Sequence, residues 1–135
     1  MFLSRLLPLL ALASLTACFE GEPYCIAEEG PCSCDGAGVC TWECPDGGCD
    51  YEANGAGAAT FTCEGGSCDL LATGQGAVIF DCGGGDCYAQ ATGQGDLSLS
   101  CPGGGCVVDC DGMGSCNITE CDDCECNGSL TGICS

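Results

Sequence analysis

The sequence contains no histidine and a single basic residue, Arg5, against 20 acidic residues, so its formal net charge is −19 over 135 residues. Binding to nucleic acid or to an anionic membrane surface requires clustered Lys and Arg side chains, and this charge balance argues against both. Without His or Lys, the chain also lacks a conventional imidazole base and an amine nucleophile. We therefore expect a protein that is not an enzyme and that binds no nucleic acid.

Aromatic residues are also scarce, at 6% of the chain, which is too few for a large apolar core of the ordinary kind. The abundant residues are instead 24 glycines and 19 cysteines. A chain this rich in cysteine is typically held together by disulfides or by metal ions. Cross-links are therefore expected to replace part of the missing core.

The first residues have the pattern of an export signal. A short segment with Arg5 is followed by an apolar stretch from Leu6 to Leu15. This stretch is shorter than the roughly 20 apolar residues that a membrane-spanning helix needs, and small residues come directly after it. The sequence therefore predicts a cleaved signal peptide rather than a membrane helix.

The residues Leu15, Thr16, Ala17 and Cys18 end this segment, and they resemble the lipobox of bacterial lipoproteins. The resemblance implies that residues 1–17 are removed as a signal peptide. It also implies that Cys18 receives a diacylglyceryl thioether and an N-acyl chain, and that this covalent lipid, with no other cofactor, anchors the protein in a membrane of the bacterial cell envelope.

In such lipoproteins an Asp after the lipidated cysteine favours retention in the inner membrane, and Phe19 at this position points to the outer membrane. The alternative is a plain secretory signal with Cys18 in a disulfide. Setting Cys18 aside leaves 18 of the 19 cysteines, an even number that suits complete pairing. We interpret residues 18–24 as the lipidated cysteine with an acidic spacer, and residues 25–135 as the folded domain.

This domain repeats with a period of 19 residues. C-x4-C pairs begin at Cys44, Cys63, Cys82 and Cys101. Two glycines of each copy keep the same spacing, at Gly55, Gly74, Gly93 and Gly112 and at Gly57, Gly76, Gly95 and Gly114. Such a period indicates one structural unit that stacks on its neighbours. The repeat is similar to Cys- and Gly-rich repeat proteins of bacterial envelopes, and this similarity implies no function.

Between the glycine-rich segments, polar residues alternate with uncharged residues that are expected to face inward. The inward positions are Tyr51, Leu70, Ala89, Val108, Ala53, Ala72, Ala91, Cys110, Ala59, Val78, Leu97, Cys116, Phe61, Phe80, Leu99 and Ile118. A period of two predicts half-buried β-strands, and the frequent glycines argue against helices. We therefore expect an all-β domain with two strands in each repeat.

Two all-β architectures are compatible with two strands in each repeat. A disulfide-braced β-meander would leave one apolar sheet face open to water, because no further segment is available to cover it. A small, disulfide-rich β-solenoid with coils of about 19 residues instead places two narrow parallel sheets face to face around the inward residues. We prefer the solenoid.

The cysteine spacing predicts bridges across the ends of the coils. The expected pairs are Cys44–Cys49, Cys63–Cys68, Cys82–Cys87, Cys101–Cys106, Cys34–Cys40 and Cys110–Cys116. Six further cysteines are left for three bridges in the caps, at Cys25, Cys32, Cys121, Cys124, Cys126 and Cys134. The pairing of these six cannot be deduced, because six cysteines allow 15 connectivities.

Metal binding is the main alternative use of these residues. The close cysteine spacings at both ends of the domain would suit zinc or copper, although an exported chain reaches an oxidising compartment. Carboxylates could hold Ca²⁺, and the candidates are Asp50 and Asp69, which should be neighbours on adjacent coils, together with Asp122 and Asp123. We favour a solvated acidic surface and expect no metal.

A further alternative is an ice-binding surface, which would need a flat and regular array of threonines. The outward positions are instead mixed, with Thr60, Ile79, Ser98 and Asn117 in one column and Thr62, Asp81, Ser100 and Thr119 in the next. The sequence thus favours a lipid-anchored, non-enzymatic structural or adhesive module. Its expected partners are the membrane, through the lipid, and an envelope or surface protein or glycan.

Overall fold

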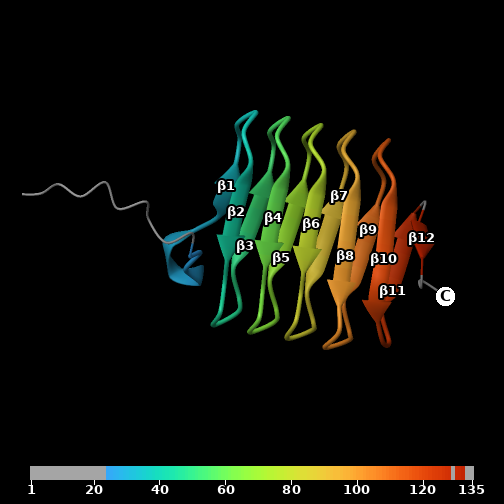
Figure 1. The fold of residues 1–135 in the computed structure, drawn as a ribbon. Coiled ribbons are helices and arrows are strands. Elements are labelled where there is room, and N and C mark those ends of the chain that lie inside the picture. The colour runs from blue at the N-terminus through green and yellow to red at the C-terminus, as the bar shows by residue number, and fades with distance from the viewer. Residues whose placement is uncertain (1–23, 129, 133–135) are drawn as a thin grey trace, which may run out of the picture.

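The computed structural model describes residues 24–128 and 130–132. Figure 1 shows two sheets of short strands that face each other, with the coils stacked along one axis. The expected signal peptide at residues 1–17 and the lipidation site Cys18 lie outside the described residues. Among the helices that the structure describes, none is long and apolar enough to cross a membrane.

The strands form two six-stranded sheets. The odd-numbered sheet consists of β1 (Cys32–Cys34), β3 (Asp50–Ala53), β5 (Asp69–Ala72), β7 (Tyr88–Ala91), β9 (Val107–Cys110) and β11 (Glu125–Gly128), in that order. The even-numbered sheet consists of β2 (Cys40–Glu43), β4 (Ala59–Thr62), β6 (Val78–Asp81), β8 (Leu97–Cys101), β10 (Cys116–Cys121) and β12 (Leu130–Gly132). A short 3-10 helix, η1 (Ala27–Glu29), precedes them.

Neighbouring strands pair in parallel, and from β1 to the first part of β10 they pair in a register of 19 residues. The register differs at the C-terminal end, where Glu125 is opposite Val107 and Cys116 is opposite Leu130. Tyr51 is opposite Leu70, and Leu70 is opposite Ala89. The chain alternates between the two sheets, so one repeat forms one coil with a strand in each sheet. The solenoid prediction is confirmed, and the meander is wrong, because a meander would pair consecutive strands antiparallel.

The inward residues form the core as the alternation predicts. All sixteen of the inward positions identified in the sequence are buried, and the part of the chain that the structure describes buries no polar or charged residue. Tyr51 and Phe61 pack with their ring centroids 4.6 Å apart. The Tyr51 hydroxyl donates a hydrogen bond to the Thr62 carbonyl oxygen at 2.8 Å, so its polar group is satisfied inside the coil.

Glycine is required where the turns of successive coils stack. A Cβ atom at Gly76 would overlap the carbonyl oxygen of Gly57 in the coil before it. Gly85, in the other turn, has a φ of +79°, a backbone conformation that residues with a Cβ rarely adopt. The period of 19 residues in the glycines therefore reflects both close backbone approach and turn geometry.

The cysteines bridge the ends of the coils. The structure joins all six pairs expected from the spacing, namely Cys34–Cys40, Cys44–Cys49, Cys63–Cys68, Cys82–Cys87, Cys101–Cys106 and Cys110–Cys116. In the caps it joins Cys25 to Cys32 and Cys121 to Cys124. Cys126 is also in a disulfide. The bridges thus close the coils covalently near their turns.

One outward column differs from the expectation. Glu120, and not Thr119, stands opposite Ser100, because the pairing of β10 with β8 shifts after Ile118. The physical reason is the length of this coil. Cys101 and Cys121 pair across 20 residues instead of 19, so one extra residue forms a bulge in β10. The Thr119 side chain donates a hydrogen bond to the Leu99 carbonyl oxygen at 3.3 Å.

Candidate functional sites

Three groups of cysteine sulfurs lie close enough together to resemble metal sites. Within each group the sulfurs are within 4.8 Å of one another, and the groups are Cys101, Cys106, Cys121 and Cys124; Cys44, Cys49 and Cys68; and Cys63, Cys82 and Cys87. Every one of these cysteines is in a disulfide. A metal needs the deprotonated thiolate, so these sulfurs would become ligands only after reduction.

The four carboxylates named as candidates for Ca²⁺ do not form one site. Asp50 and Asp69 are opposite each other on β3 and β5, as the repeat predicts. Asp122 and Asp123 lie in the turn between β10 and β11, at the other end of the array (Figure 1). Asp123 adopts a left-handed backbone conformation with a φ of +54°. The four carboxylates therefore form two separate pairs, Asp50 with Asp69 and Asp122 with Asp123.

A shallow pocket of about 300 Å³ lies on the outward face of the odd-numbered sheet. Asp50 and Asp69 line it, and so do Glu52, Leu71 and Tyr88. These residues come from β3, β5 and β7, where outward positions of neighbouring coils stand directly beside each other. The spacing between strands is about 4.8 Å, so the side chains form fixed rows across the face.

The electrostatics of this pocket follow from the two stacked carboxyl groups. Burial, and the negative charge of Asp50, raise the pKa of Asp69 above the ordinary value for aspartate. The lone base of the whole sequence is Arg5, so no basic side chain of the described chain neutralises this charge. A positively charged group placed here would relieve the repulsion between the two carboxylates.

Of the pocket residues that the sequence analysis did not single out, which include Glu52, the two with large apolar groups at outward positions are Leu71 and Tyr88. Both occupy outward positions, where most other side chains of the strands are polar, and each is 37% exposed. The available signal was the break in alternation, because a large apolar residue at an outward position is the exception in such a pattern. Inspecting the outward columns for apolar members would have found them.

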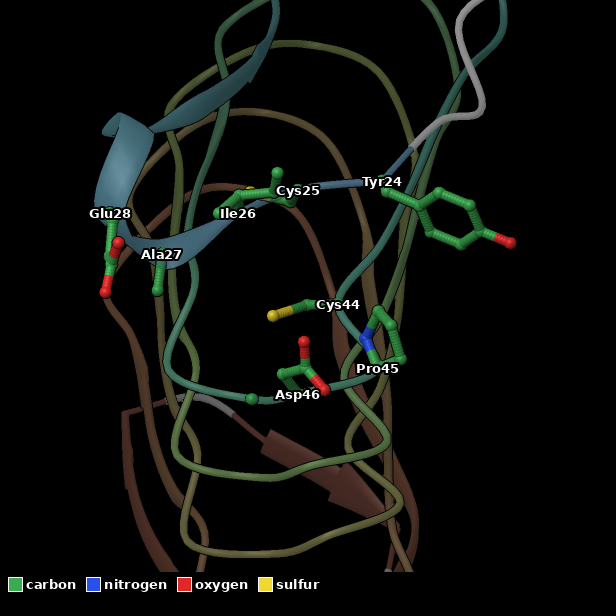
Figure 2. Close-up of a pocket in the computed structure, with 9 residues that line it drawn as sticks. Tyr24, Cys25, Ile26, Ala27, Glu28, Cys44, Pro45 and Asp46 are labelled. Atoms are coloured by element: carbon green, nitrogen blue, oxygen red, sulfur yellow. The ribbon is translucent and has the colours of Figure 1, made fainter.

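A second cavity, of about 410 Å³, opens at the N-terminal end of the solenoid. Figure 2 shows its lining, with Cys25, Ile26 and Ala27 on one side and the turn of Cys44, Pro45 and Asp46 on the other. The segment before β1 is held in place by the Cys25 N–H, which donates to the Glu43 carbonyl oxygen at 2.7 Å. The segment before β1 therefore covers this end of the solenoid only in part and leaves the cavity open.

The outward face of the even-numbered sheet is chemically different. Hydroxyl and amide side chains occupy most of its outward positions, among them Thr41, Thr60, Thr62, Ser98, Ser100 and Asn117. Ile79 interrupts one column and is 54% exposed. The other column alternates acids with hydroxyl groups, in the order Glu43, Thr62, Asp81, Ser100 and Glu120. The columns are thus mixed and offer no uniform array of threonines.

The glycine-rich turns opposite the C-x4-C segments carry short polar ladders. The Asn54 side-chain amide donates to Asp35 at 3.1 Å, and the Thr73 hydroxyl donates to Asn54 at 2.6 Å. On the same side, the backbone N–H and the hydroxyl of Ser115 both donate to Asp96, and these hydrogen bonds lower the pKa of Asp96. These hydrogen bonds link successive coils.

The chain matches none of the protein-family models, curated proteins or solved structures with which it was compared.

Proposed function

We propose that this protein is a non-enzymatic interaction module of the bacterial cell envelope, anchored by a lipid on Cys18. Its solenoid would act as a rigid support that holds side chains in rows for contact with another envelope component or surface. The lipobox residues Leu15 to Cys18 support the anchor, and Phe19 favours the outer membrane, on its periplasmic or surface side.

The observation that carries this proposal is the division between interior and surface. The described interior holds apolar residues and disulfides, together with the hydrogen-bonded hydroxyl of Tyr51, and no charged side chain. The acids of the described strands all lie outward, and those of β3, β5 and β9 stand in columns fixed by the register of 19 residues. A surface with this regularity suits contact with a partner, because its side chains are already positioned before binding.

The anchor is tested by membrane fractionation of cells that produce the full-length chain or its Cys18→Ala variant. We expect the wild-type protein in the membrane fraction and the variant in the soluble envelope fraction, because three acyl chains bind far more strongly than a single chain. A Cys18→Ala variant that still partitions with membranes refutes the lipid anchor. Cys18→Ser is a second variant with nearly the native side-chain volume.

A second candidate function is cation binding, either by the close sulfur groups or by Asp50 and Asp69. The four sulfurs around Cys101 and Cys121 lie within 4.8 Å of one another, a spacing that a soft metal could use if they were reduced. Counting free thiols in protein purified without reductant separates the two functions. A count near zero supports the braced module, whereas many thiols together with bound metal support sequestration.

A further inference from the structure

Two outward columns of the odd-numbered sheet combine acids with large apolar groups. The first contains Asp50, Asp69 and Tyr88, and the second contains Glu52 and Leu71. Tyr88 stands directly beside Asp69, and Leu71 directly beside Glu52. We call these five residues the acidic-aromatic face. They line the pocket of about 300 Å³ described above.

The opposite sheet provides a contrast on the same scaffold. One of its outward columns holds mainly hydroxyl groups, and its exposed apolar residue Ile79 is adjacent to Thr60 and Ser98 in that column. The next column contains the acids Glu43, Asp81 and Glu120, but Thr62 and Ser100 separate them, so no two of these carboxylates stand side by side. Stacked carboxylates beside a tyrosine thus distinguish the acidic-aromatic face within the described strands.

Charge identifies the kind of partner that fits. The described chain carries no Lys, Arg or His, and the single base of the sequence lies at Arg5. The carboxylates of the face therefore have no cation of their own, and a second copy of the chain would bring only more negative charge. The ring of Tyr88 accepts a cation on its face, and Leu71 can cover the aliphatic stem of a Lys or Arg side chain.

We propose that the acidic-aromatic face docks a basic peptide segment of a partner protein. The carboxylates of Asp50 and Asp69 hold a Lys or Arg head group, while Tyr88 and Leu71 contact the same side chain or its neighbour. The proposal rests on the proposed function, in which the solenoid is an interaction module, and it assigns the surface and the chemistry of the contact.

The test measures binding of a fluorescent peptide of alternating Arg and Gly residues to the mature lipoprotein in detergent micelles, at an ionic strength of about 0.15 M, where the Debye length is about 8 Å. The first variant carries Asp50→Asn and Asp69→Asn. Its matched control carries Glu43→Gln and Asp81→Asn on the even-numbered sheet, which changes the net charge equally. Tyr88→Ala and Tyr88→Phe separate the role of the ring from that of the hydroxyl.

We expect the first variant to weaken binding about tenfold and the control about twofold or less, because a distant exposed charge is largely screened. Tyr88→Ala should weaken binding about two- to fivefold. Tyr88→Phe should bind the peptide as the wild-type protein does, since the ring face is retained. The affinity should also fall as salt is added. All these residues are exposed or half-buried, so the variants keep the core unchanged.

Equal weakening by the two charge variants overturns the proposal, because it would show diffuse attraction by the acidic surface. The proposal is also overturned if chitohexaose, an uncharged oligosaccharide, binds instead and is lost in Tyr88→Ala, or if only Ca²⁺ binds. These outcomes leave the membrane partition of the Cys18→Ala variant unaffected. Failure of the docking face is therefore distinguishable from failure of the lipid-anchored function.

Discussion

Replacing Phe80 with Ala is predicted to destabilise the solenoid strongly, whereas replacing its neighbour Ile79 should not. Both residues lie on β6, but Phe80 is fully buried and Ile79 is 54% exposed. Phe80 is opposite Phe61 in the coil before it and opposite Leu99 in the coil after it. Its ring also meets that of Tyr51 edge-on, with the centroids 6.0 Å apart.

The magnitude follows from the area that the ring removes from water. A buried phenylalanine removes about 200 Å², which at about 25 cal/mol per Å² gives about 5 kcal/mol as an upper bound. Phe→Ala substitutions in protein cores cost about 3–5 kcal/mol, and we expect about 4 kcal/mol for Phe80→Ala. Ile79→Ala should change the stability by about 0.5 kcal/mol or less, as surface substitutions do.

The assay is equilibrium unfolding in guanidinium chloride with the disulfides intact, followed by far-ultraviolet circular dichroism. The two variants share a strand and differ only in which side of it they alter. Equal loss of stability in Phe80→Ala and Ile79→Ala would refute the reasoning, because it would mean that the two faces of β6 are not inside and outside a solenoid.

Three further predictions concern the bridges, the turns and a buried hydroxyl. Removing one bridge by Cys63→Ala and Cys68→Ala should cost about 2 kcal/mol on the chain-entropy model, checked by the same denaturation; no loss would mean that the bridge does not constrain the unfolded chain. Gly76→Ala should lower the melting temperature, because its Cβ would overlap the Gly57 carbonyl oxygen, whereas Gly38→Ala, which has open space, should not; equal effects would contradict the stacking of the turns. Burial, and to a lesser extent Glu43, raise the pKa of Tyr51. The stability that Tyr51 contributes is therefore complete below a pH of about 10, the ordinary pKa of tyrosine, and falls above it as the unfolded chain loses the proton. Unfolding measured across this range should show a weaker dependence on pH in Tyr51→Phe, and an identical dependence would show that Tyr51 ionises alike in both states.

The fold could be predicted from the sequence because two patterns, the alternation of residues and the spacing of cysteines, indicate the same structure. Alternation with a period of two separated inward residues such as Phe61 and Leu99 from their outward neighbours, and the cysteine spacing defined the coil. In a solenoid each inward position repeats at the same place in every coil, so a pattern in one repeat is checked by the next. Because of this redundancy, the core residues and the six coil bridges could be predicted without homologous sequences.

The remaining features depend on information that the repeat does not contain. The bulge at Thr119 arises from one extra residue, and spacing alone does not say whether a turn or a strand absorbs it. The pairing of Cys25 with Cys32 belongs to an irregular cap, where no neighbouring copy constrains the choice.

The central claim is that one cysteine carries a lipid and the others brace an interaction module. The most direct test is the intact mass of the mature protein, purified from membranes without reductant and compared with the reduced chain. The account predicts an N-terminus at Cys18 that carries a diacylglyceryl group and an N-acyl chain, and the loss of one hydrogen from each of the other 18 cysteines. An unmodified Cys18, or a full complement of thiols with bound metal, would contradict it.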